Sequence, residues 1–436
     1  MSAKKKRPKP SRRLFLKGSA AAAATPLVTG CASLPPVLGE DRPIRVGLIG
    51  CGGRGTGAAL QAMRAKGTAT ELVAMGDAFA DRLDGSYNSL KTALGEENAH
   101  QLAVDDAHRF VGLDAFEKVI DSDLDCVILT TPPGFRPAHL RRAVEAGRHV
   151  FSEKPAAVDA PGVRSVLESA QIARTKGLSL VCGFCWRFNA RHRALWERVH
   201  AGQIGTVRTM YNNYNAGPIG TQARQDGWTD MEWQLRNWHH FNWLSGDHIT
   251  EQAVHSLDKM AWSFDDVPPE RATAVGGRIA RSGAESGNIF DHFSVTYEYP
   301  DGAKAFHMSR QIPNCAFQNN DYIFGTRGTA TIKGWDPLHL IEGEQPWEYE
   351  GPGNDMYQQE HDELFASIRD RQPINQGEWL AHSTLLAIMG RMAAYTGQVI
   401  TWEQALNSEQ RLGPDSLRWG QLEVAPVPVP GQTPFA

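Results

Sequence analysis

A glycine-rich segment constrains the fold of this chain more than any other feature. Residues 44–49 (IRVGLI) form the short, fully apolar run typical of a buried strand. The run is followed at once by Gly50-Cys51-Gly52-Gly53-Arg54-Gly55, with the spacing G-x-G-x-x-G. In such a loop the first glycine makes a tight turn, the second lets the backbone reach a pyrophosphate, and the third packs the next helix against the strand. The segment therefore predicts a βα unit whose helix N-terminus faces a dinucleotide.

A carboxylate stands where such a unit binds the adenosine ribose. The next strand is expected over residues 71–75, and Asp77 follows it, 22 residues after Gly55. Its carboxylate would bind the ribose hydroxyls and repel a 2′-phosphate, so NAD is favoured over NADP as the cofactor. Arg54 and Arg82 are close enough in sequence to leave that preference open.

Two further strands complete the predicted Rossmann domain. They are expected over residues 124–130 and 149–152, with a helix over residues 138–146 between them. Parallel strands in such sheets end at the crevice that binds the ligand. The cofactor-binding residues expected at these strand ends and on this helix are Thr131, Pro132, His139, Glu153 and Lys154.

The rest of the chain predicts an α+β domain on one large, mostly antiparallel open sheet. The expected strands cover residues 178–183, 207–214, 290–299, 303–311 and 322–332, and the expected helices 163–176, 192–201, 356–371 and 379–396. The predicted organisation is a signal segment at 1–31, a linker at 32–43, the Rossmann domain at 44–160 and the substrate domain at 161–436, which ends in an extended tail.

The glycine loop, Asp77 and Glu153-Lys154-Pro155, in this order and spacing, resemble the glucose–fructose oxidoreductase, inositol dehydrogenase and rhizopine-catabolism family (Gfo/Idh/MocA). The resemblance runs from about residue 44 into the C-terminal region and includes residues 324–330 (FGTRGTA), which are similar to a strand of the family's second domain. It implies that Lys154 lies beside the nicotinamide and the substrate. It also implies a homo-oligomer formed through the sheet of the second domain.

The same resemblance identifies a catalytic segment at residues 244–258 (LSGDHITEQAVHSLD). His255 and Asp258 match the family pattern, whereas Glu251 replaces the usual aspartate and lengthens the arm of that carboxylate. Positions four apart share a helix face, so Glu251 is expected beside His255, with His248 one turn earlier. These three residues do not have the spacing of a known metal site, so the segment favours a hydrogen-bonded substrate cluster without a metal.

Aromatic and amide side chains are dense just before this segment, in residues 228–243 (WTDMEWQLRNWHHFNW). This composition suits the recognition of a sugar, because aromatic rings stack on sugar faces and polar side chains bind hydroxyls. Half of these residues could equally belong to the core. The residues expected to bind the substrate are Trp186, Arg187, Arg236, Asn237, Trp238, His248 and Asp258.

The charge of the chain is uneven. The first 31 residues contain eight of the 45 basic residues and no acidic residue, so the remainder has a net charge of −12. Such a body is poorly suited to nucleic acids, which proteins bind with Lys and Arg. Cys182 and Cys185 lie in an apolar run without a second pair, so packing is favoured over metal or redox chemistry.

The N-terminus predicts export. Residues 11–17 (SRRLFLK) resemble a twin-arginine signal, and a short apolar, Ala-rich run follows. Residues 27–31 (LVTGC) resemble a lipobox, in which Cys31 would become the lipidated first residue. The expected location is therefore the periplasm or the cell envelope, with a lipid anchor at Cys31 as the finer expectation.

These residues predict hydride transfer from a secondary hydroxyl of a sugar, glycoside or polyol to NAD. His255 would accept the proton, Lys154 would hold the charge on the oxygen, and Glu251 would orient the histidine. Because no pool would reoxidise the cofactor after export, a tightly held NAD that is regenerated in each turnover is expected. The alternatives are hydrolysis of a glycoside through oxidation and elimination, and a non-catalytic sugar sensor.

Overall fold

The computed structural model describes residues 42–436, which belong to one compact unit. The predictions for the signal segment, for Cys31 and for most of the linker fall outside the described residues. Within residues 42–436, no helix is long and apolar enough to cross a membrane.

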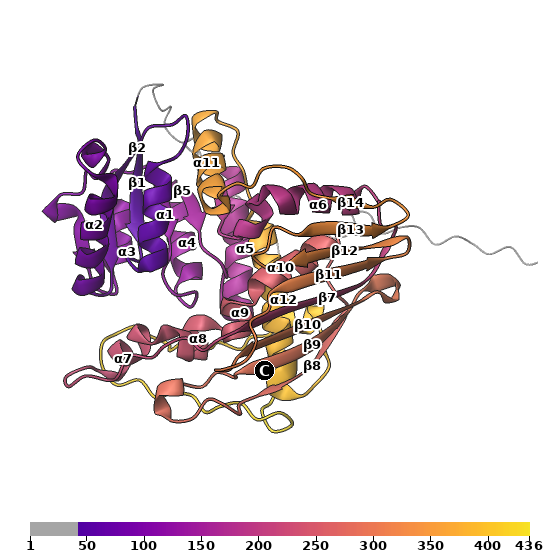
Figure 1. Ribbon diagram of the computed structural model, residues 1–436. Helices are drawn as coiled ribbons and strands as arrows, with labels where there is room; N and C mark the ends of the chain where they lie inside the picture. Colours follow the sequence, from indigo (N-terminus) through magenta and orange to yellow (C-terminus); the bar gives the residue numbers. More distant parts are fainter. Residues whose placement is uncertain (1–41) are drawn as a thin grey trace, which may run out of the picture. The chain divides into compact units, whose positions relative to one another are not determined.

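The first sheet has six parallel strands in the order β3-β2-β1-β4-β5-β6 (Figure 1). The strands are β1 (Ile44–Ile49), β2 (Thr70–Asp77), β3 (Arg109–Val111), β4 (Cys126–Leu129), β5 (His149–Ser152) and β6 (Leu180–Cys182). The helices are α1 (Gly53–Met63), α2 (Ala80–Leu94), α3 (Ala115–Asp121), α4 (Arg136–Glu145) and α5 (Ala160–Thr175). Every residue of β4 and β5 is buried, which explains why strands of a parallel sheet read as continuous apolar runs. The predicted Rossmann domain is confirmed.

The first sheet continues beyond residue 160, where the sequence analysis ends this domain. Helix α5 crosses over and returns the chain to β6, which pairs in parallel with β5 through Val150 and Leu180. Residues 161–182 therefore complete the first sheet and do not begin the second domain. A parallel neighbour needs a helical crossover, so this strand lies far along the chain from its partner.

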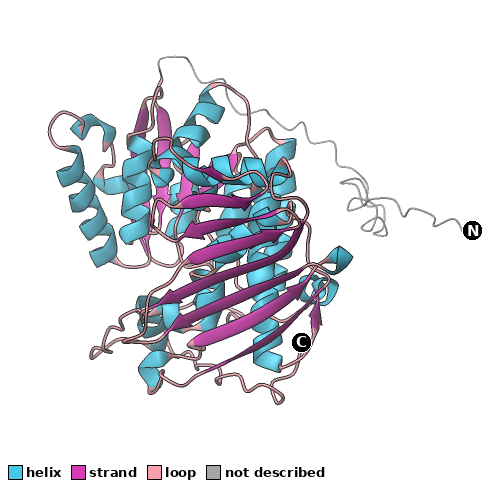
Figure 2. Cartoon of the chain, turned by 45° about the vertical axis from the view of Figure 1, so that its right-hand side comes forward, coloured by secondary structure: helices cyan, strands magenta, loops and turns pink. Residues whose placement is uncertain are grey.

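The second sheet has nine strands in the order β14-β13-β12-β11-β7-β10-β9-β8-β15. The strands are β7 (Val207–Ala216), β8 (Arg271–Gly277), β9 (His292–Glu298), β10 (Lys304–Gln311), β11 (Asn320–Gly325), β12 (Gly328–Lys333), β13 (His339–Gly343), β14 (Trp347–Glu348) and β15 (Ile400–Thr401). All pairs are antiparallel except β7 with β10, which confirms the mostly antiparallel sheet. Figure 2 looks onto one face of this sheet, and helices lie behind it.

One predicted strand is a hairpin. The run expected as a single strand over residues 322–332 turns at Thr326 and Arg327, and β11 pairs with β12 on either side of that turn. The turn has no Asn-Gly or Asp-Gly pair, the strongest short-range signal for a hairpin. Strands β8, β13, β14 and β15 also lie outside the ranges expected from the sequence.

The remaining helices all follow β6 in the chain. They are α6 (Ala190–His200), α7 (Asp230–Arg236), α8 (Asn242–Ser245), α9 (His248–Glu251), α10 (Val254–Ser263), α11 (Met356–Arg369), α12 (Gly377–Thr396) and α13 (Trp402–Asn407). Helix α12 packs against α5, α10 and β8.

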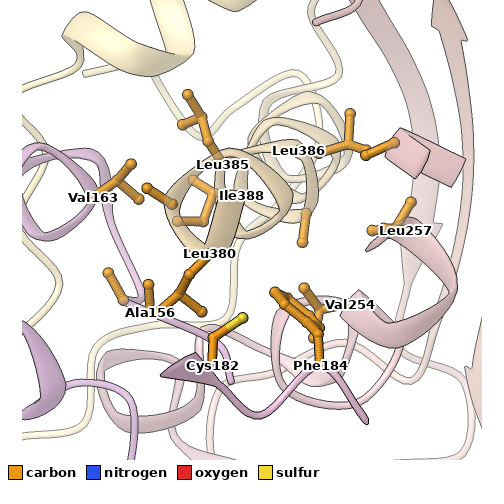
Figure 3. Packing of buried hydrophobic residues seen from close by; sticks show 14 of the residues in the cluster. Ala156, Val163, Cys182, Phe184, Val254, Leu257, Leu380, Leu385, Leu386 and Ile388 are labelled. Atoms are coloured by element: carbon orange, nitrogen blue, oxygen red, sulfur yellow. The ribbon is translucent and has the colours of Figure 1, made fainter. Parts of the chain in front are cut away.

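The core of the molecule is centred on α12 (Figure 3). Leu380 and Ile388 of α12 belong to one buried hydrophobic cluster with Val163 of α5 and Val254 of α10. Cys182, at the end of the first sheet, packs into the same cluster as a buried free thiol, as expected from its apolar surroundings. Because this cluster draws on both sheets, it fixes the first sheet relative to α10, which carries His255.

Candidate active site

A cavity of about 650 Å³ begins at the carboxyl ends of the first sheet. Its volume is within the range of about 300–1,000 Å³ that is usual for small-molecule sites. The sequence-predicted residues in its wall are Gly50, Gly52, Gly53, Arg54, Gly55, Asp77, Thr131, Pro132, His139, Glu153, Lys154, Arg236, Asn237, Trp238, Glu251 and His255.

The glycine loop has the geometry of a pyrophosphate cradle. Gly50 has a φ of +97°, and a Cβ there would lie 2.7 Å from the backbone nitrogen of Thr131. A Cβ on Gly55 would lie 1.9 Å from the carbonyl oxygen of Gly50, so only glycine permits this approach of α1 to β1. A Cβ on Gly52 or Gly53 would meet nothing within 4 Å, so the space in front of the α1 N-terminus stays open.

Asp77 lies at the end of β2, beside this loop. Its Oδ2 accepts a hydrogen bond from the backbone N–H of Cys51 at 2.6 Å, and its Oδ1 accepts one from Phe79 at 3.0 Å. Burial raises the pKa of Asp77, although both backbone bonds oppose that rise. These two bonds fix the orientation of the carboxylate.

His139 belongs to the wall of the nucleotide cleft. Its Nδ1 lies 3.1 Å from the Thr131 hydroxyl, and its ring stacks on Phe116 with centroids 4.1 Å apart. Burial lowers the pKa of His139 to about 3, so the ring is neutral at physiological pH. Arg136 lies in the same wall and donates to the carbonyl oxygens of Thr131 and Pro155, which ties the loops after β4 and β5 together.

Lys154 and Glu251 meet in this cavity from opposite domains. The Lys154 Nζ donates to Glu251 Oε1 at 3.0 Å and to the Glu251 carbonyl oxygen at 2.5 Å. Burial would raise the pKa of Glu251, but Lys154, followed by His239 and Arg136, outweighs burial and holds the pKa below its ordinary value. The ammonium has three N–H groups, so one remains for a third acceptor.

A break in the helix creates the second of these bonds. The sequence predicts one helix that carries Glu251 and His255 on one face, whereas the chain forms two, α9 and α10, that meet at Gln252 and Ala253. The backbone N–H of His255 bonds the carbonyl of Gln252 at 3.3 Å, which leaves the carbonyl of Glu251 to Lys154. No hydrogen bond joins Glu251 to His255 within residues 42–436. The expected pairing of these two side chains is therefore wrong, and the partner of Glu251 is Lys154.

His255 is a half-buried, neutral base in the cavity wall. Its Nδ1 has no hydrogen-bond partner among the described residues, and its ring meets Phe184 edge-on at 6.1 Å. Burial lowers the pKa of His255 well below its ordinary value, and the positive charges of Lys154, Lys259 and Arg54 lower it further.

His239 is a site residue that the sequence analysis omitted. It lines the cavity, its ring stacks on Trp238 with centroids 3.6 Å apart, and Lys154 and Glu251 both act on its pKa, which burial lowers. Its position in the aromatic segment 228–243, directly after Trp238 and before the catalytic segment, is the sequence feature that could have identified it. His239 is a second neutral histidine near the Lys154–Glu251 pair.

The guanidinium of Arg54 is already bound by other side chains of the protein. It donates through Nε to Glu153, through Nη1 to Gln61 at 2.9 Å and through Nη2 to Glu360 at 2.7 Å. Its charge therefore balances two carboxylates and does not offer a site for a 2′-phosphate. Glu153 in turn accepts from the backbone N–H of Lys154 at 3.0 Å, so Arg54 supports the loop that carries the lysine.

Two residues expected to bind substrate are in the cavity wall with their polar groups already occupied. Asn237 accepts from the backbone N–H of Gln222 at 2.7 Å and donates to its carbonyl at 3.1 Å. Arg236 donates to both oxygens of Asp81, at 3.0 and 3.1 Å, and to Glu232 at 2.9 Å. Both side chains position the cavity wall, and Trp238 is the expected ring that remains on its surface.

Four residues expected to bind substrate lie outside this cavity. Arg187 forms a buried pair with Asp258, Nη2 to Oδ1 2.9 Å, and Asp258 also accepts from Ser383 at 2.8 Å. His248 is buried against Asp247 and the carbonyl of Phe290. Trp186 lines a second cavity. The expectation that these four residues bind substrate in the main cavity is wrong, because Arg187, His248 and Asp258 pair with other protein groups in the interior and Trp186 lines the second cavity instead.

The arrangement can bind a dinucleotide and move a proton and a charge at its far end. No group of three or more His, Cys, Asp or Glu side chains in residues 42–436 could hold a metal ion. His248, Glu251 and His255 thus do not converge on a common centre.

Known proteins share both parts of this structure. The family described as "Oxidoreductase family, NAD-binding Rossmann fold" matches residues 44–184, and the "GFO/IDH/MocA C-terminal domain" matches residues 192–331. Inositol 2-dehydrogenase of Rhizobium meliloti is 22% identical over 329 residues, which cover 74% of this chain and 86% of that protein.

Two further similarities are informative. The 2,7-anhydro-N-acetylneuraminate hydratase of Escherichia coli is 24% identical over 196 residues, 45% of this chain, so the chain spans about half (48%) of that relative's length. The crystal structure of an aldose–aldose oxidoreductase from Caulobacter crescentus, complexed with glycerol, superposes with a TM-score of 0.64 at 20% identity and covers 83% of this chain and all of that one.

Proposed function

The chain belongs to the Gfo/Idh/MocA family of NAD(P)-dependent oxidoreductases, and we propose that it oxidises a secondary hydroxyl of a sugar, glycoside or polyol. One observation carries this proposal: Lys154 of the nucleotide domain and Glu251 and His255 of the second domain line the same cavity that begins at the glycine loop. A site with a neutral base and a fixed ammonium at the far end of a dinucleotide cleft suits the oxidation of an alcohol.

The residues present fit a nicotinamide dinucleotide. The open space before Gly52 and Gly53 and the α1 N-terminus would hold its pyrophosphate, and Asp77 would bind the adenosine ribose. NAD is proposed over NADP because Asp77 would repel a 2′-phosphate and Arg54 is already bound to Glu153 and Glu360. When bound, the cofactor supplies the hydride acceptor.

The proton and the charge are handled by the protein. His255 is neutral and can accept the hydroxyl proton. The free N–H of the Lys154 ammonium holds the negative charge that develops on the substrate oxygen, and Glu251 keeps that ammonium in place. His239 lines the same cavity, and the charges of Glu251 and Lys154 both affect its pKa.

A contact of Arg236 with Asp81 and Phe79, here called the clasp, joins the two domains and favours a cofactor that stays bound through each turnover. Arg236 of α7 pairs with Asp81 of α2, its guanidinium lies 4.0 Å from the centroid of the Phe79 ring, and its side chain is only 13% exposed. Phe79 lies two residues after Asp77, so this contact closes the cleft at the end proposed for adenosine. Release of the cofactor would require this contact to open, which favours a reaction that is redox-neutral over each cycle.

Hydrolysis of a glycoside through transient oxidation and elimination is the second candidate. Among the histidines of the cavity wall, His239 and His255 lie on separate elements at its reacting end, and an elimination needs a base in addition to the one that serves the oxidation. A relative named as a hydratase adds to this candidate, since water addition is one of its steps.

One experiment separates these functions. The protein is denatured and the supernatant is assayed for NAD and NADP; the native protein is then screened, without added cofactor, against single sugars, pairs of sugars and aryl glycosides. Oxidation of one sugar with reduction of another supports the oxidoreductase. Release of aglycone with solvent deuterium at the carbon next to the transient ketone supports the hydrolase. A protein that binds no dinucleotide, or turns over none of these compounds, contradicts both.

Export is proposed on the residues 11–17 that resemble a twin-arginine signal, and a lipid anchor on Cys31. Replacement of Arg12 and Arg13 by lysine should leave the protein in the cytoplasm. In the chain with its arginines intact, the Cys31→Ala variant should appear in the soluble fraction of the envelope if the anchor exists. Export of the lysine variant would overturn the proposal.

A homodimer is proposed through the face of the nine-stranded sheet seen in Figure 2. Phe306 and Met308 of β10 and Phe324 of β11 are exposed on their strands by 37%, 39% and 42%. Strands β10 and β11 flank β7, and exposed apolar side chains on neighbouring parts of one sheet are typical of an interface between protein chains. The Phe306→Glu variant should be monomeric by light scattering while the wild type is not; equal masses would contradict the proposal.

A further inference from the structure

A second, smaller cavity lies behind the wall of the main one. Its volume is about 250 Å³, and it is formed by the 3-10 helix Cys185–Phe188, the start of α6, the turn between β12 and β13, and the segment before α11. Tyr357 lines both cavities, so the two adjoin at this residue. The volume is below the range of about 300–1,000 Å³ for drug-sized ligands, and it suits a unit as small as one sugar ring.

An exposed tryptophan forms one side of this cavity. Trp335 is 59% exposed, and its ring centroid lies 4.6 Å from that of Trp186, which is buried. Trp186 is in turn supported by the ring of His192, with centroids 4.8 Å apart. The Trp335 ring is therefore exposed to solvent and supported from below by buried rings. Such a ring can bind the C–H face of a sugar, since aromatic faces attract these groups.

Polar groups with unused hydrogen-bonding capacity surround the ring. The guanidinium of Arg191 has no hydrogen bond or ion pair within residues 42–436, although Asp336 and Asp355 line the same cavity. Each of these carboxylates accepts backbone N–H groups through Oδ1 alone, Asp336 from Leu338 and Asp355 from Tyr357 and Gln358. One cation with two anions favours a neutral ligand with several hydroxyls over an anion.

A histidine chain adds a buried acceptor. The His339 Nδ1 lies 3.0 Å from the carbonyl oxygen of Pro337, which can only accept, so this nitrogen carries the proton. The His339 Nε2 therefore accepts from the Nδ1 of His192, 2.9 Å away, while burial and then Lys259 hold the pKa of His192 far below its ordinary value. The His192 Nε2 is left as a bare acceptor with no partner in the described part of the chain. A donor such as a hydroxyl group would satisfy it.

We propose that this second cavity binds a neutral sugar ring next to the one that is oxidised, so that the substrate is a glycoside of at least two sugar units. The proposal deepens the function proposed above and rests on it for the identity of the first ring. Trp335 would stack on the second ring, Arg191 and the two carboxylates would bind its hydroxyls, and Tyr357 would lie beside the linkage between the two units.

The test compares disaccharides with their monosaccharides on the intact protein. Cellobiose, maltose, lactose and chitobiose, with glucose, galactose and N-acetylglucosamine, are titrated by calorimetry into the wild type and into Trp335→Ala, Arg191→Ala and Phe317→Ala. Phe317 is a matched control, 58% exposed and outside both cavities. At least one disaccharide should bind the wild type about tenfold more tightly than its monosaccharides, a difference of about 1.4 kcal/mol. Trp335→Ala and Arg191→Ala should remove that advantage, and Phe317→Ala should keep it.

Kinetics provide an independent arm. For a disaccharide that is turned over, Trp335→Ala should raise KM about tenfold with little change in kcat, and KM for the monosaccharide should stay unchanged. Disaccharides that bind no better than monosaccharides, or equal effects of Trp335→Ala and Phe317→Ala, would overturn the second sugar site. Absence of turnover with the binding pattern intact would count against the proposed function alone.

Discussion

Lys154 and Glu251 form an ion pair across the two domains, with Nζ 3.0 Å from Oε1. Lys154 follows β5 of the first sheet, and Glu251 ends α9 at the second. Their side chains are only 13% and 12% exposed, so each charge depends on the other for solvation. The reacting end of the cavity is therefore held in place by the packing of one domain on the other.

Removal of either partner should damage the same function. We expect Lys154→Ala and Glu251→Ala each to lower kcat/KM strongly, and the double variant to be little worse than either alone. Residues in direct contact couple by about 0.5–3 kcal/mol, whereas remote residues add independently. The measurement is a double-mutant cycle on kcat/KM, with Glu251→Ala and Arg271→Ala as the uncoupled control, since Arg271 is exposed on β8. Additive losses at residues 154 and 251 would contradict the pairing.

The pH dependence should report His255. Burial, followed by the charges of Lys154, Lys259 and Arg54, lowers the pKa of His255. A base acts when it is unprotonated, so a lowered pKa keeps it active in more acidic solution, and kcat/KM should stay level as the pH falls through 6.5. The acid limb should appear only at a lower pH, and Lys154→Gln, which removes one of the charges, should move that limb upward.

The matching control is His255→Ala. It should lose about 10²- to 10⁴-fold in kcat, the usual contribution of a general base, while the cofactor stays bound. Its residual rate should lack the acid limb. An acid limb of the wild type at or above pH 6.5 would show that a group other than His255 is the base.

Asp77 should set the preference between the two cofactors. Asp77→Ala should weaken NAD binding about 10- to 100-fold, because hydrogen bonds to charged groups contribute about 1.5–3 kcal/mol. NADP should be affected less, since repulsion of its 2′-phosphate is lost at the same time. Calorimetry with both dinucleotides measures the ratio, and Asp77→Asn, which removes the charge but keeps one acceptor oxygen for Cys51 or Phe79, is the matched variant. An unchanged ratio would place the ribose elsewhere.

Arg236 should control how long the cofactor stays bound. Arg236→Ala removes the bonds to Asp81 and the contact with Phe79, so NAD should dissociate faster, in stopped-flow displacement, with the hydride step preserved. Arg224→Ala is the control, because Arg224 pairs with Asp230 of the same segment and not with the first domain. Equal dissociation rates in the two variants would exclude the clasp.

Arg187 should act on stability and not on substrate binding. Its pair with Asp258 is buried, and removal of one partner of a buried pair costs about 3–5 kcal/mol. We expect Arg187→Ala to lower the free energy of unfolding in urea by that order, with KM of the folded enzyme unchanged. Arg193→Ala breaks an exposed pair with Glu363 and should cost about 0–1 kcal/mol. A raised KM with normal stability would restore the substrate-binding role.

Much of the nucleotide half could be predicted from the sequence. The turn at Gly50, the close approach at Gly55 and the position of Asp77 depend on local backbone geometry, which a short motif specifies almost by itself. The central strands β1, β2, β4 and β5 were equally evident, because burial on both faces requires continuous apolar runs, whereas the half-exposed edge strand β3 was not predicted.

The roles of the charged side chains could not be predicted in this way. Arg54 binds Glu360, which is 306 residues away in the sequence, and Lys154 binds Glu251, which is 97 residues away. An arginine in a binding motif looks the same in sequence whether it faces a ligand or a buried carboxylate.

The sequence by itself determined the family, the fold of both domains and the loop that faces a dinucleotide. Only the tertiary structure decided that α9 and α10 separate at Gln252, so that Lys154 and not His255 binds Glu251. It also decided that Arg187 and Asp258 are interior while His239 reaches the cavity. The physical reason is that backbone conformation follows from neighbouring residues, whereas the partner of a charge is whichever opposite charge the packing of the core brings within reach.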